Sequence, residues 1–316
     1  MKKALICGVS GQDGAYLAKL LIKKNYEVHG TSRDIDTANW SSLKTLEIYE
    51  DITLHSMSPI DFKSVLDVFN NCNPDEVYFL AGQSSVALSF EQPSETIQST
   101  VLGILNILEA CKLSKNKIKL YNAGSSECFG DMPDKIADEK TPFQPKSPYA
   151  VGKSASYWLV SNYRDSYNLF ACTGILFNHE SPLRPKRFVT QKIIQTAKRI
   201  ANGSNEKLLL GRLDIERDWG WAPEYVEAMW KMLQLDSPTD FVIATGETHS
   251  LEYFVKEVFN FYGLNWENHV VKDPKFLRPS ELKISTANPE KAFKELNWKA
   301  KLKLKDIIKL LCEFND

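Results

Sequence analysis

The stretch Ala4-Leu5-Ile6-Cys7-Gly8-Val9-Ser10-Gly11-Gln12-Asp13-Gly14 decides the fold of this 316-residue chain. A short apolar run is followed by three glycines at the spacing Gly-x-x-Gly-x-x-Gly, and a helical pattern then begins at Gly14. A turn of this kind brings free amides to a helix N-terminus, where a dinucleotide pyrophosphate binds, and glycine lets the backbone approach closely. The stretch therefore predicts a buried first strand and a dinucleotide site at Gly8, Gly11 and Gly14.

The first 180 residues alternate short β-rich runs with longer helical patterns. Strands are predicted at 4–8, 27–32, 52–57, 76–81, 118–122 and 170–177, and helices at 14–24, 60–71, 95–114 and 149–168. Strands separated by helices pair in parallel through right-handed crossovers. The pattern predicts an α/β fold with a doubly wound parallel sheet of the Rossmann type.

The later part of the chain is less regular and predicts a smaller α/β second domain. We expect residues 1–177 to form the dinucleotide-binding domain, and residues 178–217 and 249–316 to form the second one. Residues 218–248 are expected to return to the first domain, with a seventh strand at 241–245.

Composition excludes several classes of protein. Apolar residues make up 43% and charged residues 25%, and 39 Lys and Arg against 40 Asp and Glu give a net charge of -1. This balance gives no long-range attraction to nucleic acid or an anionic membrane. No apolar run approaches the roughly 18 residues of a membrane span, and the first apolar run continues into the glycine turn instead of a signal-peptide cleavage pattern. Six cysteines without a CxxC pair and five dispersed histidines predict no metal site and a reducing cytoplasm.

Cofactor choice is expected to be decided at the end of the second strand, in Arg33-Asp34. An acidic residue there accepts bonds from the ribose 2′-hydroxyl of NAD, whereas an arginine pairs with the 2′-phosphate of NADP. The chain has both, so NADP and NAD stay open.

Tyr149 and Lys153 stand four residues apart at the start of a predicted helix and share one face. A neighbouring ammonium stabilises phenolate and is expected to lower the pKa of the tyrosine from ~10 toward working pH. Tyrosinate can accept a hydroxyl proton while hydride leaves the same carbon. Ser125, after the fifth strand, supplies a hydroxyl that completes a Ser-Tyr-Lys set.

Glu127 adds chemistry that oxidation alone does not need. Two residues past Ser125 on an extended strand end, its carboxylate is expected on the same side, since strand side chains alternate. It can remove the proton α to a new ketone and so permit β-elimination of water. The alternative is an oxidoreductase or epimerase that uses Ser125, Tyr149 and Lys153 without elimination.

Longer motifs make the chain resemble the GDP-mannose 4,6-dehydratases, which belong to the extended short-chain dehydrogenase/reductase superfamily. The resemblance covers nearly the whole chain. Its most specific stretches are Asn178-His179-Glu180-Ser181-Pro182 and Arg217-Asp218-Trp219-Gly220, and Arg278-Pro279-Ser280-Glu281 matches as well.

The resemblance implies a lyase that converts GDP-mannose or a GDP-manno-heptose to the GDP-4-keto-6-deoxy sugar, for deoxy sugars of surface polysaccharides. Tyr149 would deprotonate the 4-hydroxyl during oxidation at C4, and Glu127 would take the C5 proton and help water leave from C6. A tightly bound NADP or NAD would be recycled in each turnover. The second domain would bind the nucleotide sugar, and the chain would form a homo-oligomer, dimer or tetramer.

Further site residues follow from the resemblance. Beside Tyr149 and Lys153, the cofactor set comprises Gly8, Ser10, Gly11, Gln12, Asp13, Gly14, Arg33, Leu80, Ala81, Gln83, His179 and Arg184. The substrate set comprises Ser84, Ser126, Asn178, Val189, Lys192, Gly211, Arg217, Arg278 and Glu281. Arginine and lysine suit a diphosphate on charge grounds alone.

Overall fold

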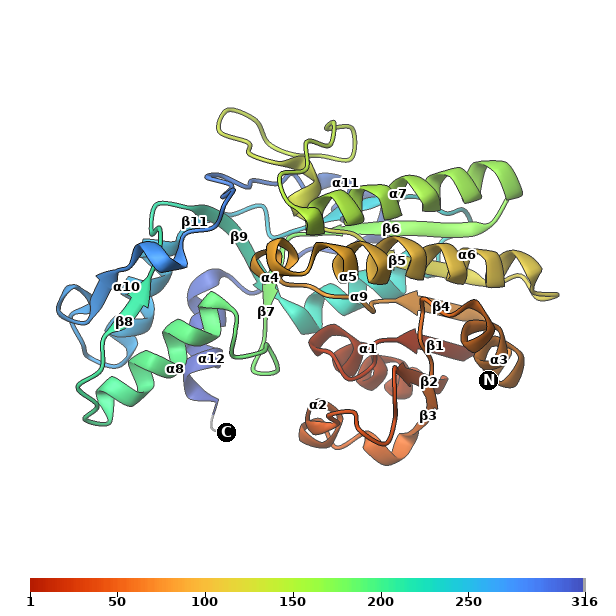
Figure 1. Cartoon of the computed structure of the whole chain (residues 1–316), viewed down its shortest axis with the longest axis horizontal. Coiled ribbons are helices and arrows are strands. Elements are labelled where there is room, and N and C mark those ends of the chain that lie inside the picture. Colours follow the sequence, from red (N-terminus) through yellow and green to blue (C-terminus); the bar gives the residue numbers. More distant parts are fainter. Residues whose placement is uncertain (315–316) are drawn as a thin grey trace.

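A seven-stranded sheet, all parallel, forms the centre of the computed structural model, which describes residues 1–314 (Figure 1). Its strands are β1 (Lys3–Cys7), β2 (Glu27–Ser32), β3 (Ile52–Ser56), β4 (Glu76–Phe79), β5 (Lys119–Ala123), β6 (Phe170–Leu176) and β10 (Phe241–Ile243). Their order is β10-β6-β5-β4-β1-β2-β3, and each neighbouring pair is parallel. The chain winds outward from β1 on one side and from β4 on the other, which confirms the predicted doubly wound fold.

Helices cover both faces of this sheet. The chain forms α1 (Gln12–Lys23), α2 (Ser41–Thr45), α3 (Phe62–Cys72), α4 (Val86–Glu91), α5 (Pro93–Ile97), α6 (Gly103–Leu113), α7 (Pro148–Tyr167), α8 (Val189–Ala201), α9 (Ala222–Leu233), α10 (Leu251–Phe261), α11 (Glu290–Leu296) and α12 (Leu304–Glu313). On one face, α1, α9 and α11 pack against Ile6 and Tyr78. On the other, α3, α6 and α7 pack against Leu5 and Val77. Neighbouring strand residues thus enter opposite cores, as strand alternation requires.

Two small sheets carry the rest of the chain. One has the order β11 (Thr248–Ser250), β9 (Glu216–Trp221), β7 (Asn178–Glu180), and the other pairs β12 (Val270–Lys272) with β8 (Leu208–Leu210). A separate apolar core joins α8, α10 and α12, which lie at the left of Figure 1. The division into a cofactor domain and a sugar-nucleotide domain stays a prediction. Residues 315–316, which were assigned to the second domain, lie outside the described part of the chain.

Helix ends follow local chemistry. Asp61 caps α3, accepting from the Lys63 amide at 3.1 Å, and Ser147 caps α7, accepting from the Ala150 amide at 3.1 Å. The predicted helix 95–114 is instead three successive segments, with a π-helical turn (Gln98–Leu102) between α5 and α6. That turn lies against α7. The helices α2 and α4 were not predicted, because they are too short to show a helical repeat of apolar residues.

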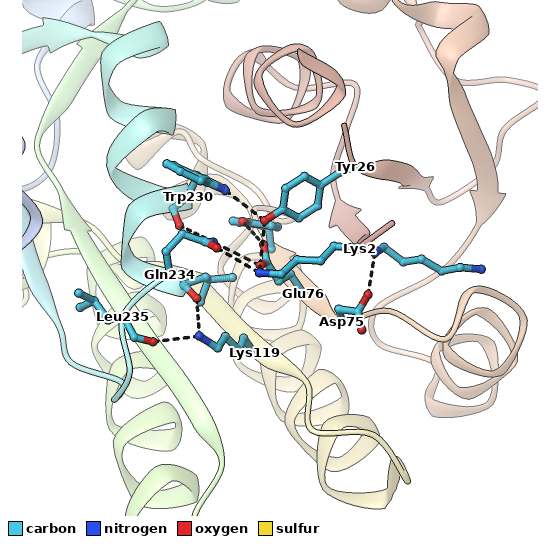
Figure 2. A network of polar contacts seen from close by, with 11 residues as sticks. Lys2, Tyr26, Asp75, Glu76, Lys119, Trp230, Gln234 and Leu235 are labelled. Atoms are coloured by element: carbon cyan, nitrogen blue, oxygen red, sulfur yellow. Dashed lines mark hydrogen bonds and ion pairs between the residues drawn. The ribbon is translucent and has the colours of Figure 1, made fainter. Parts of the chain in front are cut away.

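A buried carboxylate holds together the edge of the sheet where the strands begin (Figure 2). Glu76, 1% exposed, accepts from the Lys2 ammonium at 2.9 Å, the Tyr26 hydroxyl at 3.0 Å and the Gln234 amide at 3.2 Å. Its second oxygen accepts from the Tyr78 hydroxyl at 2.7 Å. The network joins β1, β4 and α9, at the edge opposite the glycine turn.

None of the helices within residues 1–314 is long and apolar enough to cross a membrane.

Candidate active site

The glycine turn lies between the end of β1 and the start of α1. Gly8 has a φ of +90°, and a Cβ on Gly14 would lie 2.3 Å from the Gly8 carbonyl oxygen, so neither position tolerates a side chain. Gly11 is the N-cap residue of α1, and no side chain within residues 1–314 caps this helix. Its first amides therefore point out beside Ser10 with no capping oxygen, and this cradle fits a dinucleotide pyrophosphate.

The other predicted cofactor residues after β4 lie in one segment. A Cβ on Gly8 would be 3.1 Å from the backbone of Ala81, so Leu80 and Ala81 border the turn directly. The Gln83 amide donates to the Ser85 carbonyl at 2.8 Å and to Thr96 Oγ1 at 3.2 Å, which fixes this segment. Ser84, predicted for the substrate, is exposed on the same segment.

Asp34 is occupied by its own turn. One carboxylate oxygen accepts from the Asp36 amide at 2.9 Å and the other from the Thr37 hydroxyl at 2.9 Å. These bonds, the Asp36 amide first, lower the pKa of Asp34. The Arg33 side chain is 81% exposed, with a guanidinium nitrogen 3.6 Å from Glu95. Arg33 is thus the side chain with donors to offer an incoming 2′-phosphate.

The Ser-Tyr-Lys set assembles at the strand end after β5. Tyr149 and Lys153 stand in the first two turns of α7, both 8% exposed, and Ser125, also 8% exposed, interacts with the Tyr149 phenol. The Lys153 ammonium donates to the Ala123 carbonyl at 2.7 Å and lies 5.9 Å from the centroid of the Tyr149 ring. Ser147, which was not predicted as a site residue, caps α7 and so sets where this helix begins. It thereby places Tyr149 in the first turn.

The expected lowering of the tyrosine pKa is wrong for the protein groups alone. Burial raises the pKa of Tyr149, and the Ser125 hydroxyl only partly opposes it. Burial also lowers the pKa of Lys153 to about 8, so the cost of a buried ammonium governs this lysine. Proximity in sequence predicted the pair but not the burial that dominates it.

Glu127 does not stand on an extended strand end, so the alternation argument for it is wrong. Strand β5 ends at Ala123, and Ser125 caps a 3₁₀ helix, η3 (Ser126–Phe129), by accepting from the Glu127 amide at 3.3 Å. Burial raises the pKa of the Glu127 carboxyl, and the guanidinium groups of Arg217 and Arg278 act against this rise. Glu127 therefore faces the predicted substrate arginines.

Glu281 joins those two arginines. Its Oε1 accepts from Arg217 at 3.1 Å and from Arg278 at 3.2 Å. Arg217, on β9 and 5% exposed, also donates to the carbonyls of Glu216 and Leu282. The structure thus brings Glu127 and three predicted substrate residues into one charged group.

The remaining substrate residues lie around this group without a direct bond to it. Lys192 donates to the Leu209 carbonyl at 2.7 Å, with its ammonium 3.5 Å from the centroid of the Phe276 ring. A Cβ on Gly211 would lie 2.7 Å from the Phe276 carbonyl oxygen. Asn178 begins β7, Val189 begins α8, and Ser126 is buried in η3. Phe276 was not predicted as a neighbour of Lys192, because no sequence motif includes it.

His179 and Asp13 meet although 166 residues separate them. His179 Nε2 lies 2.9 Å from Asp13 Oδ2, and the ring stacks on Tyr225 with centroids 4.6 Å apart. Gln12 donates to the His179 carbonyl at 3.3 Å and accepts from Ser181 at 2.8 Å. Arg184 Nε lies 3.6 Å from Glu180. The sequence analysis missed Ser181 and Tyr225 as members of this site.

Within residues 1–314, no cluster of three His, Cys, Asp or Glu side chains forms a metal site.

Fold and site define a class, the extended short-chain dehydrogenases/reductases: a doubly wound sheet, a glycine turn and a buried Ser-Tyr-Lys set. The sequence profile described as GDP-mannose 4,6 dehydratase matches residues 5–311. The chain belongs to the GDP-mannose 4,6-dehydratase family.

Full-length relatives support this membership. GDP-mannose 4,6 dehydratase 1 of Arabidopsis thaliana is 43% identical over 99% of this chain and 89% of its own length. The GDP-mannose 4,6-dehydratase of Vibrio cholerae is 40% identical over 97% and 91%.

Solved structures share the fold. The UDP-glucose 4-epimerase of Thermotoga maritima, solved with UDP-glucose, superposes with a TM-score of 0.87 at 21% identity, covering 98% of this chain and 97% of the other. The dTDP-glucose 4,6-dehydratase of Bacillus anthracis, solved with NAD, gives 0.84 at 17% identity over 98% and 96%.

Proposed function

We propose that this protein is a hydro-lyase that converts GDP-mannose to its GDP-4-keto-6-deoxy product. Its relatives carry the name of this activity over nearly their full length. The observation that carries the proposal is the position of Glu127: a partly buried carboxylate near Arg217 and Arg278, in the 3₁₀ helix η3 that Ser125 caps. Oxidation alone needs no such group.

Each catalytic group has a role that its position supports, although burial raises the pKa of Tyr149 and so acts against its role as proton acceptor. Tyr149, beside the Ser125 hydroxyl, accepts the proton of the sugar 4-hydroxyl, and Lys153 holds positive charge in the same buried region. Glu127 removes the C5 proton and, once protonated, gives a proton to the hydroxyl that leaves C6. Its raised pKa suits this double role, because the same carboxyl must both take and return a proton. A bound nicotinamide dinucleotide supplies the hydride acceptor at C4 and the hydride donor at C6.

The substrate diphosphate fits the charged group described above. Arg217 and Arg278 offer guanidinium donors, and Glu281 holds both in place. The Lys192 ammonium over the Phe276 ring adds a cation and an aromatic face at the neighbouring strand β8.

For the cofactor we propose NADP. The Asp34 carboxylate is held by the Asp36 amide and the Thr37 hydroxyl, whereas Arg33 is exposed. A carboxylate that already accepts two hydrogen bonds is a weaker acceptor for the 2′-hydroxyl of NAD than a free carboxylate is. The turn at Gly8 serves either dinucleotide.

We also propose a homo-oligomer built on α7, in a reducing cytoplasm. Val151 and Trp158, seven residues apart on one stripe of α7, are 47% and 60% exposed, and Leu102 before α6 is 39% exposed. A second copy of this face would cover that stripe. All six cysteines are free and buried, as fits a reducing compartment. Light scattering of Trp158→Glu, expected to give a smaller particle than the parent protein, tests the assembly.

Mass spectrometry of the product tests the activity. With GDP-mannose, we expect a product lighter by one water. Glu127→Gln is expected to stop at the 4-keto stage, lighter by two hydrogens, with the dehydration rate down by about 100- to 10,000-fold. A wild-type product lighter only by two hydrogens would mean a 4-dehydrogenase and would overturn the role of Glu127. GDP-manno-heptose in a parallel reaction compares the two sugars.

A further inference from the structure

The contact between Asp13 and His179 joins two segments that the cofactor must span. Asp13 stands in the first turn of α1, directly after the glycine turn, and His179 stands in β7, directly after β6. The imidazole is 7% exposed. No residue of the proposed proton chemistry is part of this pair, so its purpose needs another explanation.

Hydrogen-bond geometry fixes the protonation of the imidazole. His179 Nδ1 lies 2.7 Å from the Phe177 carbonyl oxygen, and Nε2 lies 2.9 Å from Asp13 Oδ2. A carbonyl and an ionised carboxylate only accept, so both ring nitrogens must donate. A neutral imidazole has one N–H, and only the imidazolium satisfies both bonds.

The carboxylate side of the contact agrees. Gln12 donates to the other Asp13 oxygen at 2.9 Å. Although burial acts to raise the pKa of Asp13, His179 and Gln12 outweigh it and bring the pKa to about 2. Burial likewise acts to lower the pKa of His179, and Asp13 outweighs it, so the pKa is raised. The two groups hold each other charged.

The surroundings bring two further cations and two neutral rings. The positive charge of Arg184 lowers the pKa of His179, which disfavours the imidazolium, and lowers the pKa of Asp13, which favours the carboxylate. The charge on Asp13 raises the pKa of Lys153 on α7. Tyr225 from α9 and Tyr121 from β5 face the pair, and burial raises the pKa of both phenols well above 10, so they bring no charge. Asp13 is thus the anion bonded to the imidazolium, while the Glu180 carboxylate lies 3.6 Å from Arg184.

We propose that Asp13 is a positioning residue: its carboxylate keeps His179 doubly protonated, and the charged pair clamps the phosphate-binding turn to the strand end after β6. The clamp would set the distance between the pyrophosphate half and the nicotinamide half of the cofactor site. This inference rests on the proposed use of a nicotinamide dinucleotide. It assigns the Asp13 side chain to His179 instead of to direct contact with the cofactor.

The pair has a defined pH window. A raised His179 pKa means that the pair is complete below pH 6.5 and is lost as pH rises through the folded-state value. A depressed Asp13 pKa means that it survives acid down to about pH 2. Cofactor binding should therefore weaken on the alkaline side as His179 loses its proton.

Asp13→Asn separates charge from shape. The asparagine amide can donate to an unprotonated Nε2 while Nδ1 still donates to Phe177, so the bridge remains without its charges. Nitrogen-15 NMR of the histidines at pH 6.5, with the His179 signal identified by its loss in His179→Gln, should show two protonated ring nitrogens in the parent protein and one in Asp13→Asn. Titration with NADPH should show affinity weakened by roughly 10- to 100-fold.

Asp240→Asn is the matched control, since Asp240 is 8% exposed and pairs with Arg164 at 2.8 Å, where strand β10 begins. It should leave the His179 signal and the NADPH affinity unchanged. A neutral His179 in the parent protein overturns the proposal, whether or not Asp13→Asn folds. Equal NADPH affinity in Asp13→Asn and the parent protein overturns it too. A parent protein that binds no dinucleotide would instead refute the proposed function, while the NMR signal would still report the pair.

Discussion

Burial governs the protonation of the single side chains that we propose as catalytic groups. It raises the pKa of Glu127 and Tyr149 and lowers that of Lys153, in each case as the largest cause. All three shifts favour the neutral form of the group. For Glu127 and Lys153 the shift brings the pKa closer to neutral pH, where a general acid or base works best, whereas the shift of Tyr149 takes its pKa further away.

The turnover rate should consequently depend on pH from both sides. Glu127 acts as a base only when ionised, so the rate should rise with pH through a value above its ordinary 4.5. The charge on Lys153 is lost near pH 8, so the rate should fall there. The dependence of kcat on pH, measured with GDP-mannose, checks both limbs. A rate that stays level through pH 8 would contradict the role of the lysine.

The choice between dinucleotides should follow Arg33. Arg33→Ala removes a charge-assisted bond to a 2′-phosphate and should weaken NADP binding by roughly 10- to 100-fold, with NAD binding little changed. Asp34→Ala is the matched control, because its carboxylate serves the turn at Asp36 and Thr37. Fluorescence titration with NADPH and NADH compares the variants. Stronger NADPH binding in Asp34→Ala would instead mean that Asp34 repels the phosphate.

The sequence predicted which of the proposed catalytic residues lie together better than it predicted their surroundings. Tyr149 and Lys153 share a helix, so their spacing alone places them on one face. Asp13 and His179 are 166 residues apart, and no local pattern shows that a turn after β1 meets a strand after β6. The pKa directions were missed for the same reason, because burial depends on what distant segments bring.

At the scale of the elements, strand β4 begins at Glu76, the buried carboxylate at the centre of the network in Figure 2. Glu76→Gln keeps the shape but places an amide donor against donors such as Lys2 and Tyr78. The free energy of unfolding, from urea titration, should fall by about 1–3 kcal/mol, while kcat stays unchanged because the site lies at the other edge. Asp75→Asn, the neighbouring substitution, alters a carboxylate that accepts from the Lys3 amide at 2.8 Å at the exposed side of the sheet, and should change stability far less. A loss of kcat in Glu76→Gln at full stability would contradict this separation.

The predicted strands agree closely with the observed ones because their apolar runs are short, buried and flanked by polar turns. The helix predicted at 95–114 fails in its interior: the π-helical turn from Gln98 to Leu102 depends on packing against α7, which the sequence of the segment does not reveal. The predicted position of Glu127 on an extended strand end was also wrong, because the local sequence does not distinguish a strand end from a 3₁₀ turn.

At the scale of the whole molecule, late segments complete the early core. Helix α9 packs on α1, β10 extends the sheet beside β6, and Trp298 joins the same apolar cluster as Leu17. Calorimetry should therefore show one unfolding transition, and a chain of residues 1–177 alone should not give the far-ultraviolet circular dichroism of a folded sheet protein. Two separate transitions would contradict this interdependence.

The chain passes from the parallel sheet to the small sheets after β6, returns through α9 and β10, and leaves again at β11. This has a consequence for how such a protein can diversify. No contiguous stretch of its gene encodes the small sheets and their helices alone, so recombination between relatives cannot exchange them all without also exchanging β10 of the central sheet. New sugar specificities in this architecture would arise mainly by substitution in place, at the proposed substrate positions such as Lys192 on α8 and Arg278 in the loop after β12, with the sheet inherited unchanged.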